Sequence, residues 1–252
     1  MMKDIDVVVA GHLCLDLYPD LSSFEPGVFF NRLLPGKLLS VGNMSFCTGG
    51  PVSNTGLALA KLGMTVRSMG KIGQDAFGEI ISRILNEFNP SIGSGLITSS
   101  NTGSSYTVIL SAPGIDRVFL NYPGTNDTFV PDDIDYELVA RFSLFHFNYP
   151  PLMRKMFADG GYNLAEIYHR VKECGVITSL DMALPGPNSD AERADWAEIL
   201  EKTLPYVDIF APSIEEILFI LDKDAFYQLA ITLIRKEYIE CLAEFINQLS
   251  NQ

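Results

Sequence analysis

Residues 49–63 combine a glycine pair with an expected helix that begins at a proline. The stretch reads Gly-Gly-Pro-Val-Ser-Asn-Thr-Gly-Leu-Ala-Leu-Ala-Lys-Leu-Gly, and Gly73 follows ten residues after Gly63. Glycine lets a backbone approach a ligand closely, and the first turn of a helix presents N–H groups that lack intrahelical partners. Asn54 adds a side chain that both donates and accepts hydrogen bonds. We therefore expect this segment to hold a small polar molecule.

Acidic and amide side chains follow several expected strands. Asp16 comes shortly after a first apolar strand, at the edge where open α/β sheets bind their ligands. Asn148 ends a later strand, and Asp181 follows another. A carboxylate accepts protons from two neighbouring hydroxyl groups, which is how a sugar presents them. Asp16 and Asp181 could instead cap their own loops, and His12 beside the site could be a packed histidine.

The elements that must position these residues alternate between strand and helix. Strands are expected over 5–10, 66–72, 143–148, 176–180 and 207–211, and helices over 51–62, 75–88, 132–141, 162–174, 193–203 and 213–222. Alternating elements of this length predict right-handed βαβ units on a parallel sheet that helices cover. Residues 224–249 lack glycine and proline and repeat apolar residues at helical spacing, which predicts one long helix or two abutting ones.

Two β-rich excursions interrupt this alternation. Residues 17–48 show no helical period and contain short extended runs such as 37–41 and 44–47. Two further runs, 105–111 and 117–122, are joined like a hairpin. Such runs between turn residues predict additional strands.

Composition argues against several classes of function. The 252 residues are 47% hydrophobic with a mean hydropathy of +0.17, which is enough for one sizeable core. Lys and Arg total 18 against 31 Asp and Glu, so the net charge of −13 predicts no nucleic-acid partner. No apolar run approaches about 18 residues, which predicts no membrane span. The N-terminus leads directly into a strand and no C-x-x-C pair occurs, so we expect a cytoplasmic protein with reduced thiols.

The full glycine spacing resembles the first signature of the ribokinase-like (PfkB) carbohydrate kinases. That signature is a glycine pair, an asparagine, a glycine at the helix end and another glycine ten residues later, here Gly49, Gly50, Asn54, Gly63 and Gly73. Further similar segments are Gly73-Gln-Asp-Ala-Phe-Gly78, Tyr122-Pro-Gly-Thr-Asn126 and Asp16 after the first strand. The resemblance runs from residue 4 to about 222. A glycine pair alone would suit a simple turn into a helix, so the interpretation depends on the complete spacing.

This resemblance implies an α/β fold of the three-layer ribokinase-like type, with a parallel sheet flanked by helices. It implies a single domain over residues 1–252 whose C-terminal part is truncated. The excursions at about 13–48 and 97–126 would form the small β lid of the family, which excludes water as a competing phosphoryl acceptor. The outer face of the lid would pair two subunits as a homodimer, although the excursions could also be an ordinary β decoration.

The resemblance also implies an activity, namely ATP-dependent transfer of the γ-phosphoryl group to a hydroxyl of a small-molecule sugar, with Mg²⁺ offsetting phosphate charge. The residues that would hold the sugar are Asp16, Gly49, Gly50, Asn54 and Asn148. The residues that would lie near the nucleotide phosphates are Asp181, Ser213 and Glu216, and Glu216 would also serve the metal. The sequence leaves fructose, ribose, keto-deoxy sugar acids and nucleosides open as substrates.

Ser213-Ile-Glu-Glu216 departs from the Asn-x-x-Glu motif of the family, because serine replaces asparagine. Serine can still cap the following helix, but it is a poorer organiser of a hydrated metal ion. Glu216 could also be an ordinary first-turn glutamate that the helix dipole favours.

The second signature of the family, Gly-Ala-Gly-Asp, does not occur in this sequence, because residues 200–252 contain no glycine. In the family its backbone N–H groups stabilise phosphate charge and its Asp is the general base, so no catalytic residue is assigned here. The chain is expected to be inactive as it stands. The interpretations are a truncated or frameshifted product, a fragment, or a diverged paralogue that binds a sugar or nucleoside without catalysis. The retained sugar residues favour truncation.

Overall fold

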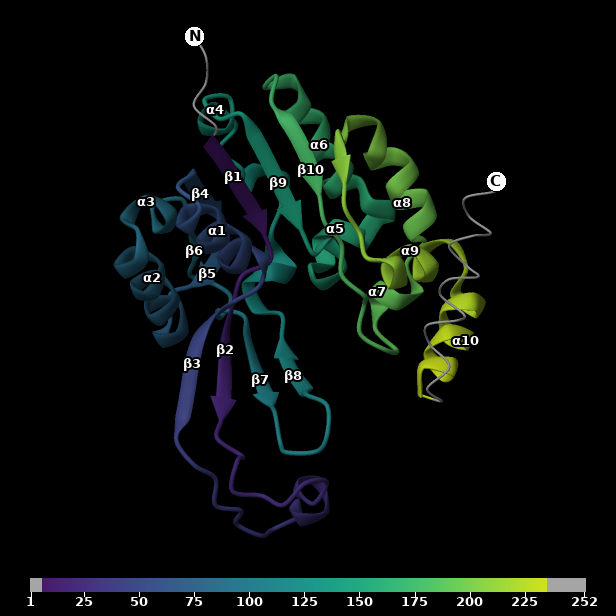
Figure 1. The fold of residues 1–252 in the computed structure, drawn as a ribbon. Coiled ribbons are helices and arrows are strands. Elements are labelled where there is room, and N and C mark those ends of the chain that lie inside the picture. The colour runs from purple at the N-terminus through teal and green to yellow at the C-terminus, as the bar shows by residue number, and fades with distance from the viewer. Residues whose placement is uncertain (1–5, 235–252) are drawn as a thin grey trace.

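A computed structural model describes residues 6–234, with side-chain surroundings for 7–228. Its main sheet has five strands in the order β11-β10-β9-β1-β4, and every neighbouring pair is parallel. These strands are β1 (Asp6–Gly11), β4 (Thr65–Met69), β9 (Leu144–Asn148), β10 (Ile177–Leu180) and β11 (Ile209–Phe210). The predicted α/β fold with a parallel sheet is confirmed (Figure 1).

Helices cover both faces of this sheet. The α-helices are α1 (Pro51–Lys61), α2 (Ala76–Phe88), α3 (Pro90–Gly93), α4 (Tyr136–Val139), α5 (Arg154–Phe157), α6 (Tyr162–Glu173), α7 (Asp190–Arg193), α8 (Trp196–Thr203), α9 (Ile214–Leu221) and α10 (Lys223–Ile234). Short 3-10 helices are η1 (Phe29–Arg32), η2 (Gly124–Thr128), η3 (Pro131–Asp133), η4 (Pro150–Leu152), η5 (Ala158–Gly161) and η6 (Leu204–Tyr206). No helix within residues 6–234 is both long and apolar enough to cross a bilayer.

Alternate residues of β1 enter two separate hydrophobic cores, because successive side chains of a strand point to opposite faces. The core toward α1 and α2 includes Val7, Val9, Val52 and Ile81. The core toward α6 and α8 includes Val8, Ala10, Tyr168 and Trp196. The chain therefore has three layers, with the carboxyl end of β1 leading out of the packed body.

A second sheet projects from that carboxyl end, as Figure 1 shows. We call it the lid sheet; its strand order is β3-β2-β7-β8, with β2 (Cys14–Pro19), β3 (Met44–Gly49), β7 (Tyr106–Leu110) and β8 (Val118–Tyr122). Across its strands Asp16 lies opposite Cys47 and Thr107, and Thr107 lies opposite Asn121. These four side chains therefore share one face of the lid sheet.

Some expected elements differ in the structure. The run over 66–72 divides, because the carbonyl of Gly70 accepts a hydrogen bond from the N–H of Ile97 and the chain leaves the main sheet there. The following strand β5 (Lys71–Gly73) pairs with β6 (Ile97–Ser99) in a separate two-stranded sheet, so residues 97–99 lie outside the lid sheet.

Two other segments also depart from expectation. Residues 37–41 pair with no strand in the described part of the chain. The helix expected over 132–141 is split into η3 and α4, because Ile134 is extended and the side chain of Asp135 accepts from the N–H of Leu138 to begin a new helix. The helix expected over 224–249 is present as α10 up to Ile234, and its remainder lies outside the described residues.

Candidate functional site

The carboxylate of Asp16 lies directly against the backbone of Gly49. The two residues are on the neighbouring strands β2 and β3, and a Cβ added to Gly49 would overlap all three carboxyl atoms of Asp16. Burial raises the pKa of Asp16, while hydrogen bonds from Cys14 and Tyr18 oppose that rise. The thiol of Cys14 donates to Oδ1 of Asp16 over 3.3 Å. A half-buried carboxylate is thus fixed over a glycine at the base of the lid sheet.

Gly50 brings the start of α1 onto the loop between β1 and β2. Its φ of +80° is in the left-handed region, and an added Cβ would lie 2.6 Å from Nδ1 and 2.7 Å from the carbonyl oxygen of His12. The N–H of Val52 donates to that carbonyl over 3.2 Å. Asn54 lies on the first turn of α1 and is exposed. The glycine pair therefore brings backbone close to two polar side chains of the protein itself, Asp16 and His12.

His12 and Asn148 leave buried polar atoms without hydrogen-bond partners. Both ring nitrogens of His12 and both amide atoms of Asn148 are in this state. The side chains lie at the carboxyl ends of adjacent strands, because Gly11 is paired with Asn148. Burial lowers the pKa of His12 to about 4, so its imidazole is neutral at pH 7. Unpaired polar groups in a protein interior are costly, which makes these four atoms candidates for a bound ligand.

Asn126 holds the loop that carries His12 to Asp16. Its Oδ1 accepts from the N–H of Leu13 over 3.2 Å, and its Nδ2 donates to the carbonyl of the same residue over 3.0 Å. Asn126 is fully buried. Its amide therefore takes the place of a strand neighbour for Leu13. The sequence contains Asn126 within a similar segment, but 113 positions separate it from Leu13, so their contact could not be inferred.

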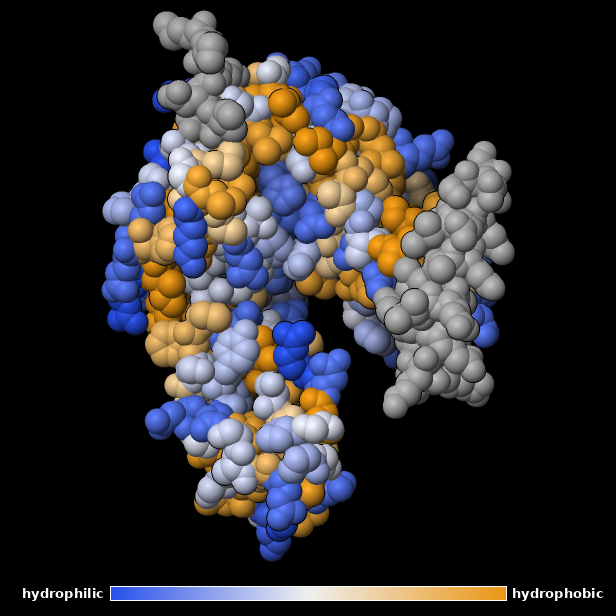
Figure 2. Space-filling view, in the orientation of Figure 1, coloured by the Kyte–Doolittle hydropathy of each residue, from blue (hydrophilic) through white to orange (hydrophobic). Residues whose placement is uncertain are grey.

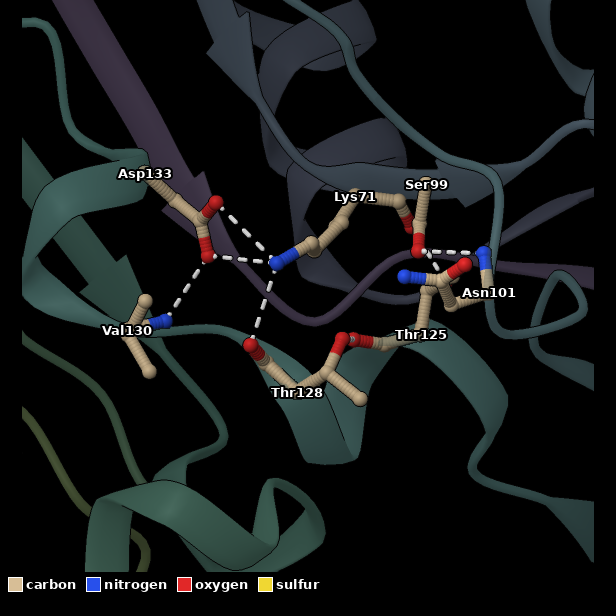
Figure 3. A network of polar contacts seen from close by, with 7 residues as sticks. All are labelled: Lys71, Ser99, Asn101, Thr125, Thr128, Val130 and Asp133. Atoms are coloured by element: carbon tan, nitrogen blue, oxygen red, sulfur yellow. Dashed lines mark hydrogen bonds and ion pairs between the residues drawn. The ribbon is translucent and has the colours of Figure 1, made fainter.

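A partly buried ion pair fixes η2, the 3-10 helix on which Asn126 lies (Figure 3). Lys71 Nζ lies 3.0 and 2.8 Å from the two carboxyl oxygens of Asp133 and also donates to the carbonyl of Thr128. Asp133 accepts from the N–H of Val130, and the hydroxyl of Thr125 donates to the carbonyl of Lys71 over 2.6 Å. Both charged side chains are only 13% exposed. This network attaches η2 to β5 in the body of the protein.

A cavity of about 810 Å³ lies between the lid sheet and the loops that follow β9 and β10. Figure 2 shows the molecule hollowed between the lid sheet and the α7 side of the body. His12 lines the cavity together with Thr107 and Asn121 of the lid sheet. The lining does not include Asp16, Gly49, Gly50 or Asn54, although Asp16 is paired with Thr107 across the lid sheet. The opposite wall includes Asp127, Leu152, Arg154, Phe157, Leu184 and Asp190.

Asp181 and Glu216 form a second acidic group near the ends of β10 and β11. Burial raises the pKa of Asp181 to about 6, and the charge of Glu216 adds to this rise. Glu216 also accepts from the N–H of Ser213 over 2.6 Å, while its own N–H donates to the Ser213 hydroxyl over 3.2 Å. The predicted serine cap is therefore present, and Glu216 has a structural role at the start of α9.

These carboxylates fit Mg²⁺ only when other groups supply most of the ligands. No cluster of three or more His, Cys, Asp or Glu side chains that could hold a metal occurs in residues 6–234. Magnesium usually retains several waters and binds one or two protein carboxylates together with substrate phosphates. Asp181 and Glu216 match that smaller donor set.

A model for the "pfkB family carbohydrate kinase" matches residues 4–251. The chain belongs to this family. It is 26% identical over 218 residues to "Probable fructokinase-6, chloroplastic" of Arabidopsis thaliana, covering 85% of this chain and 52% of that protein. It is also 26% identical over 224 residues to "Fructokinase-2" of Zea mays, covering 87% of this chain and 61% of the relative. The chain thus spans about half to three-fifths of these relatives' length.

Solved structures share the fold of this chain. An Arabidopsis thaliana ribokinase complexed with ribose and ATP superposes with a TM-score of 0.64 at 20% identity, covering 86% of this chain and 62% of the ribokinase. A fructokinase with bound ATP from Xylella fastidiosa gives 0.65 at 19% identity, covering 89% and 68%. The family and the ribokinase-like fold predicted from the sequence are therefore confirmed.

The predicted site residues of this PfkB protein lie at the base of the lid sheet and along the carboxyl edge of the main sheet. Asp16, Gly49 and Gly50 lie together at the base of the lid sheet. Asn148 lies near them at the end of β9, beside His12, whose unpaired nitrogens no sequence pattern indicates. Asp181, predicted for phosphate, follows the neighbouring strand β10 beside Asn148, because Leu180 is paired with Phe147, and Glu216 lies close enough to raise its pKa.

Proposed function

We propose that this chain provides the sugar-binding side of an ATP-dependent sugar kinase, which transfers the γ-phosphoryl group to a carbohydrate hydroxyl. The observation that carries the proposal is the carboxylate of Asp16, held over Gly49 at the junction of the lid sheet and the body. Such a carboxylate is placed to accept hydrogen bonds from two hydroxyl groups of one sugar. Membership of the carbohydrate kinase family supports this assignment.

The neighbouring groups complement a sugar in this proposal. Neutral His12 and the amide of Asn148 supply donors and acceptors that have no partner within the protein. Gly50 lets the start of α1 pack closely against His12, and Asn54 on the first turn of α1 is exposed to solvent. The lid sheet would exclude water from the transfer, since water is a competing acceptor.

The phosphate side of the reaction is assigned to Asp181, Ser213 and Glu216 in the same proposal. Mg²⁺ bound with ATP would supply charge that offsets the negative phosphates during transfer. Asp181 and Glu216 would orient waters or phosphate oxygens around the ion, and Ser213 would keep the start of α9 in place. The ATP-bound fructokinase and ribokinase with the same fold support the use of ATP.

No residue of this chain is assigned as the general base, because the 252 residues contain no Gly-Ala-Gly-Asp segment. We therefore propose that these residues bind a sugar without turning it over by themselves. The exposed apolar side chains Met44, Phe46 and Leu120 on the lid sheet favour a homodimer through the lid. The proposed location is the cytoplasm.

Isothermal titration calorimetry with fructose and ribose tests the sugar site. The wild-type chain should bind at least one of them, and Asp16→Ala should weaken binding at least tenfold. Asp116→Ala is the matched control, because Asp116 is an exposed carboxylate in the loop joining β7 and β8. Unchanged affinity in Asp16→Ala would refute the assignment. A coupled assay with ATP and Mg²⁺ should show no phosphorylation, and turnover would refute the need for a base from elsewhere.

A further inference from the structure

Tyr149 has a backbone conformation that its side chain disfavours. Its φ of 54° and ψ of 45° lie in the left-handed region, at the point where β9 ends and η4 begins. The other non-glycine residues with positive φ in the described part of the chain are Asp159 and Asn188, whose short polar side chains tolerate this region. Pro150 follows Tyr149, and a residue before proline prefers extended backbone. Tyr149 is therefore strained.

The turn alone does not account for a tyrosine at this position. The carbonyl of Tyr149 accepts from the N–H of Leu152 over 3.0 Å to begin η4, and this bond uses only the backbone. Glycine would adopt the same turn without strain. Strained residues persist where their surroundings hold them, and they are concentrated at functional sites. The tyrosine side chain itself therefore requires an explanation.

The ring of Tyr149 packs against the imidazole of His12. The two ring centres are 6.2 Å apart and the planes are inclined at 45°, which is within the range of aromatic contacts. Tyr149 follows Asn148, which is paired with Gly11, so the contact joins the ends of two adjacent strands. Gly50 covers another part of the imidazole, because a Cβ added there would lie 2.6 Å from Nδ1. A ring and a backbone segment thus enclose His12, which is only 4% exposed.

Burial dominates the chemistry of this imidazole. Neither ring nitrogen has a hydrogen-bond partner, and burial is the cause of the lowered pKa of His12. The titratable groups in its surroundings are Cys14 and Asp16 on β2, Asp127, Arg154 and Asp190 in the lining of the shared cavity, and Asp181 and Glu216, whose charges act on Tyr149. A neutral imidazole offers one donor and one acceptor, as a hydroxyl partner requires, whereas a protonated one offers donors only. Removal of the covering ring would admit water to the nitrogens and raise the pKa of His12 toward its ordinary value.

We propose that Tyr149 is a positioning residue of the sugar site, whose strained ring keeps water from His12 and so leaves both ring nitrogens for the sugar. The inference rests on the proposed function, because it requires that a sugar binds beside His12. Tyr149 acts through its ring and not through its hydroxyl group. The strained turn is retained because it places that ring against the imidazole.

Titration of the histidines followed by NMR tests the shielding of His12. The chain has three histidines, and His12→Gln identifies the signal of His12. In the wild-type chain this imidazole should titrate well below 6.5. Tyr149→Asn removes the ring and introduces a residue type that tolerates positive φ, so it should raise the pKa of His12 by about one unit or more. Tyr149→Phe keeps the ring and should leave the pKa of His12 unchanged.

Calorimetry with fructose and ribose tests the consequence for the sugar. At pH 7 Tyr149→Asn should weaken binding by about fivefold or more, because water on the imidazole must first be displaced. The loss relative to the wild type should grow as the pH falls toward about 5.5, where His12 of the variant becomes protonated. Tyr149→Phe should bind as the wild type does. Tyr162→Asn is the matched control, because Tyr162 is 64% exposed at the start of α6.

The outcomes separate this inference from the proposed function. An unchanged pKa of His12 in Tyr149→Asn, or equal effects of Tyr149→Asn and Tyr149→Phe, would overturn the inference and leave the sugar site intact. A raised pKa of His12 with unchanged sugar affinity would also overturn it, because the ring would then shield His12 without serving the sugar. Absence of sugar binding by the wild-type chain would overturn the proposed function and the positioning role together.

Discussion

Replacing Gly49 by alanine tests the contact on which the sugar site depends. Gly49 has extended backbone on β3, so alanine is compatible with its conformation. The added methyl group would, however, occupy the space of the Asp16 carboxyl group. The carboxylate must then rotate away or the strands must separate. Either response removes the half-buried position from which Asp16 would bind a sugar.

The magnitude follows from two opposing effects. Overpacking of a filled site costs about 1–3 kcal/mol of unfolding free energy. A compatible glycine-to-alanine change returns about 0.4–1 kcal/mol, because it reduces the freedom of the unfolded chain. We expect Gly49→Ala to destabilise the wild-type chain by about 1–2 kcal/mol. In an Asp16→Ala background the clash is absent, so the same change should be neutral or stabilise by about 0.5 kcal/mol, giving a coupling of about 2 kcal/mol.

A double-mutant cycle measured by urea unfolding checks this prediction. The fluorescence of Trp196, the only tryptophan in the chain and a buried one, reports unfolding. Unchanged m-values would show that the four variants unfold in the same transition. Gly186→Ala is the control, because nothing lies within 4 Å of an added Cβ there. An equal change in unfolding free energy by Gly49→Ala in both backgrounds would refute the expected clash with the Asp16 carboxyl group.

Three further substitutions test the surroundings of the site. The pKa of His12 is about 4 in the folded chain against 6.5 in the unfolded one, so acid destabilises the folded state between these pH values by up to about 3 kcal/mol. His12→Gln should flatten this pH dependence of the unfolding free energy in urea titrations. An unaltered pH dependence would contradict the role of His12. Lys71→Met leaves the largely buried carboxylate of Asp133 without its cation and should lower the free energy of unfolding by about 3 kcal/mol. Lys71→Met/Asp133→Leu should recover most of this loss. Equal losses in the two variants would exclude the ion pair as the cause. Asn126→Asp keeps the oxygen that accepts from the N–H of Leu13 but removes the amide that donates to its carbonyl. Thermal unfolding should therefore show a loss of about 1–3 kcal/mol in unfolding free energy. An unchanged transition would show that the amide donor contributes nothing.

Features set by short stretches of sequence could be predicted, whereas contacts between distant stretches could not. Asp75 begins α2 by accepting from the N–H of Gly78, and Ser213 begins α9, because capping depends on three or four neighbouring residues. The division of the run over 66–72 depends on Ile97, which a local pattern does not contain. Strand register likewise places Asp16 over Gly49, although 33 positions separate them in the sequence. The resemblance identified both residues, but only the fold shows that they touch.

Several hydrogen bonds hold the base of the lid sheet to the body. The N–H of Leu15 donates to Ser105, the hydroxyl of Ser105 donates to Tyr122, and Asn126 pairs with Leu13. These bonds join the separate crossings between body and lid, so the loop that carries Asp16 is held from several sides. The imidazole of His12 and the adjacent amide of Asn148 on β9 are nevertheless buried without partners, which costs stability. Their unpaired atoms are better explained by a ligand that completes them, which is why the sugar is assigned to this junction and not to the acidic group at the end of β10.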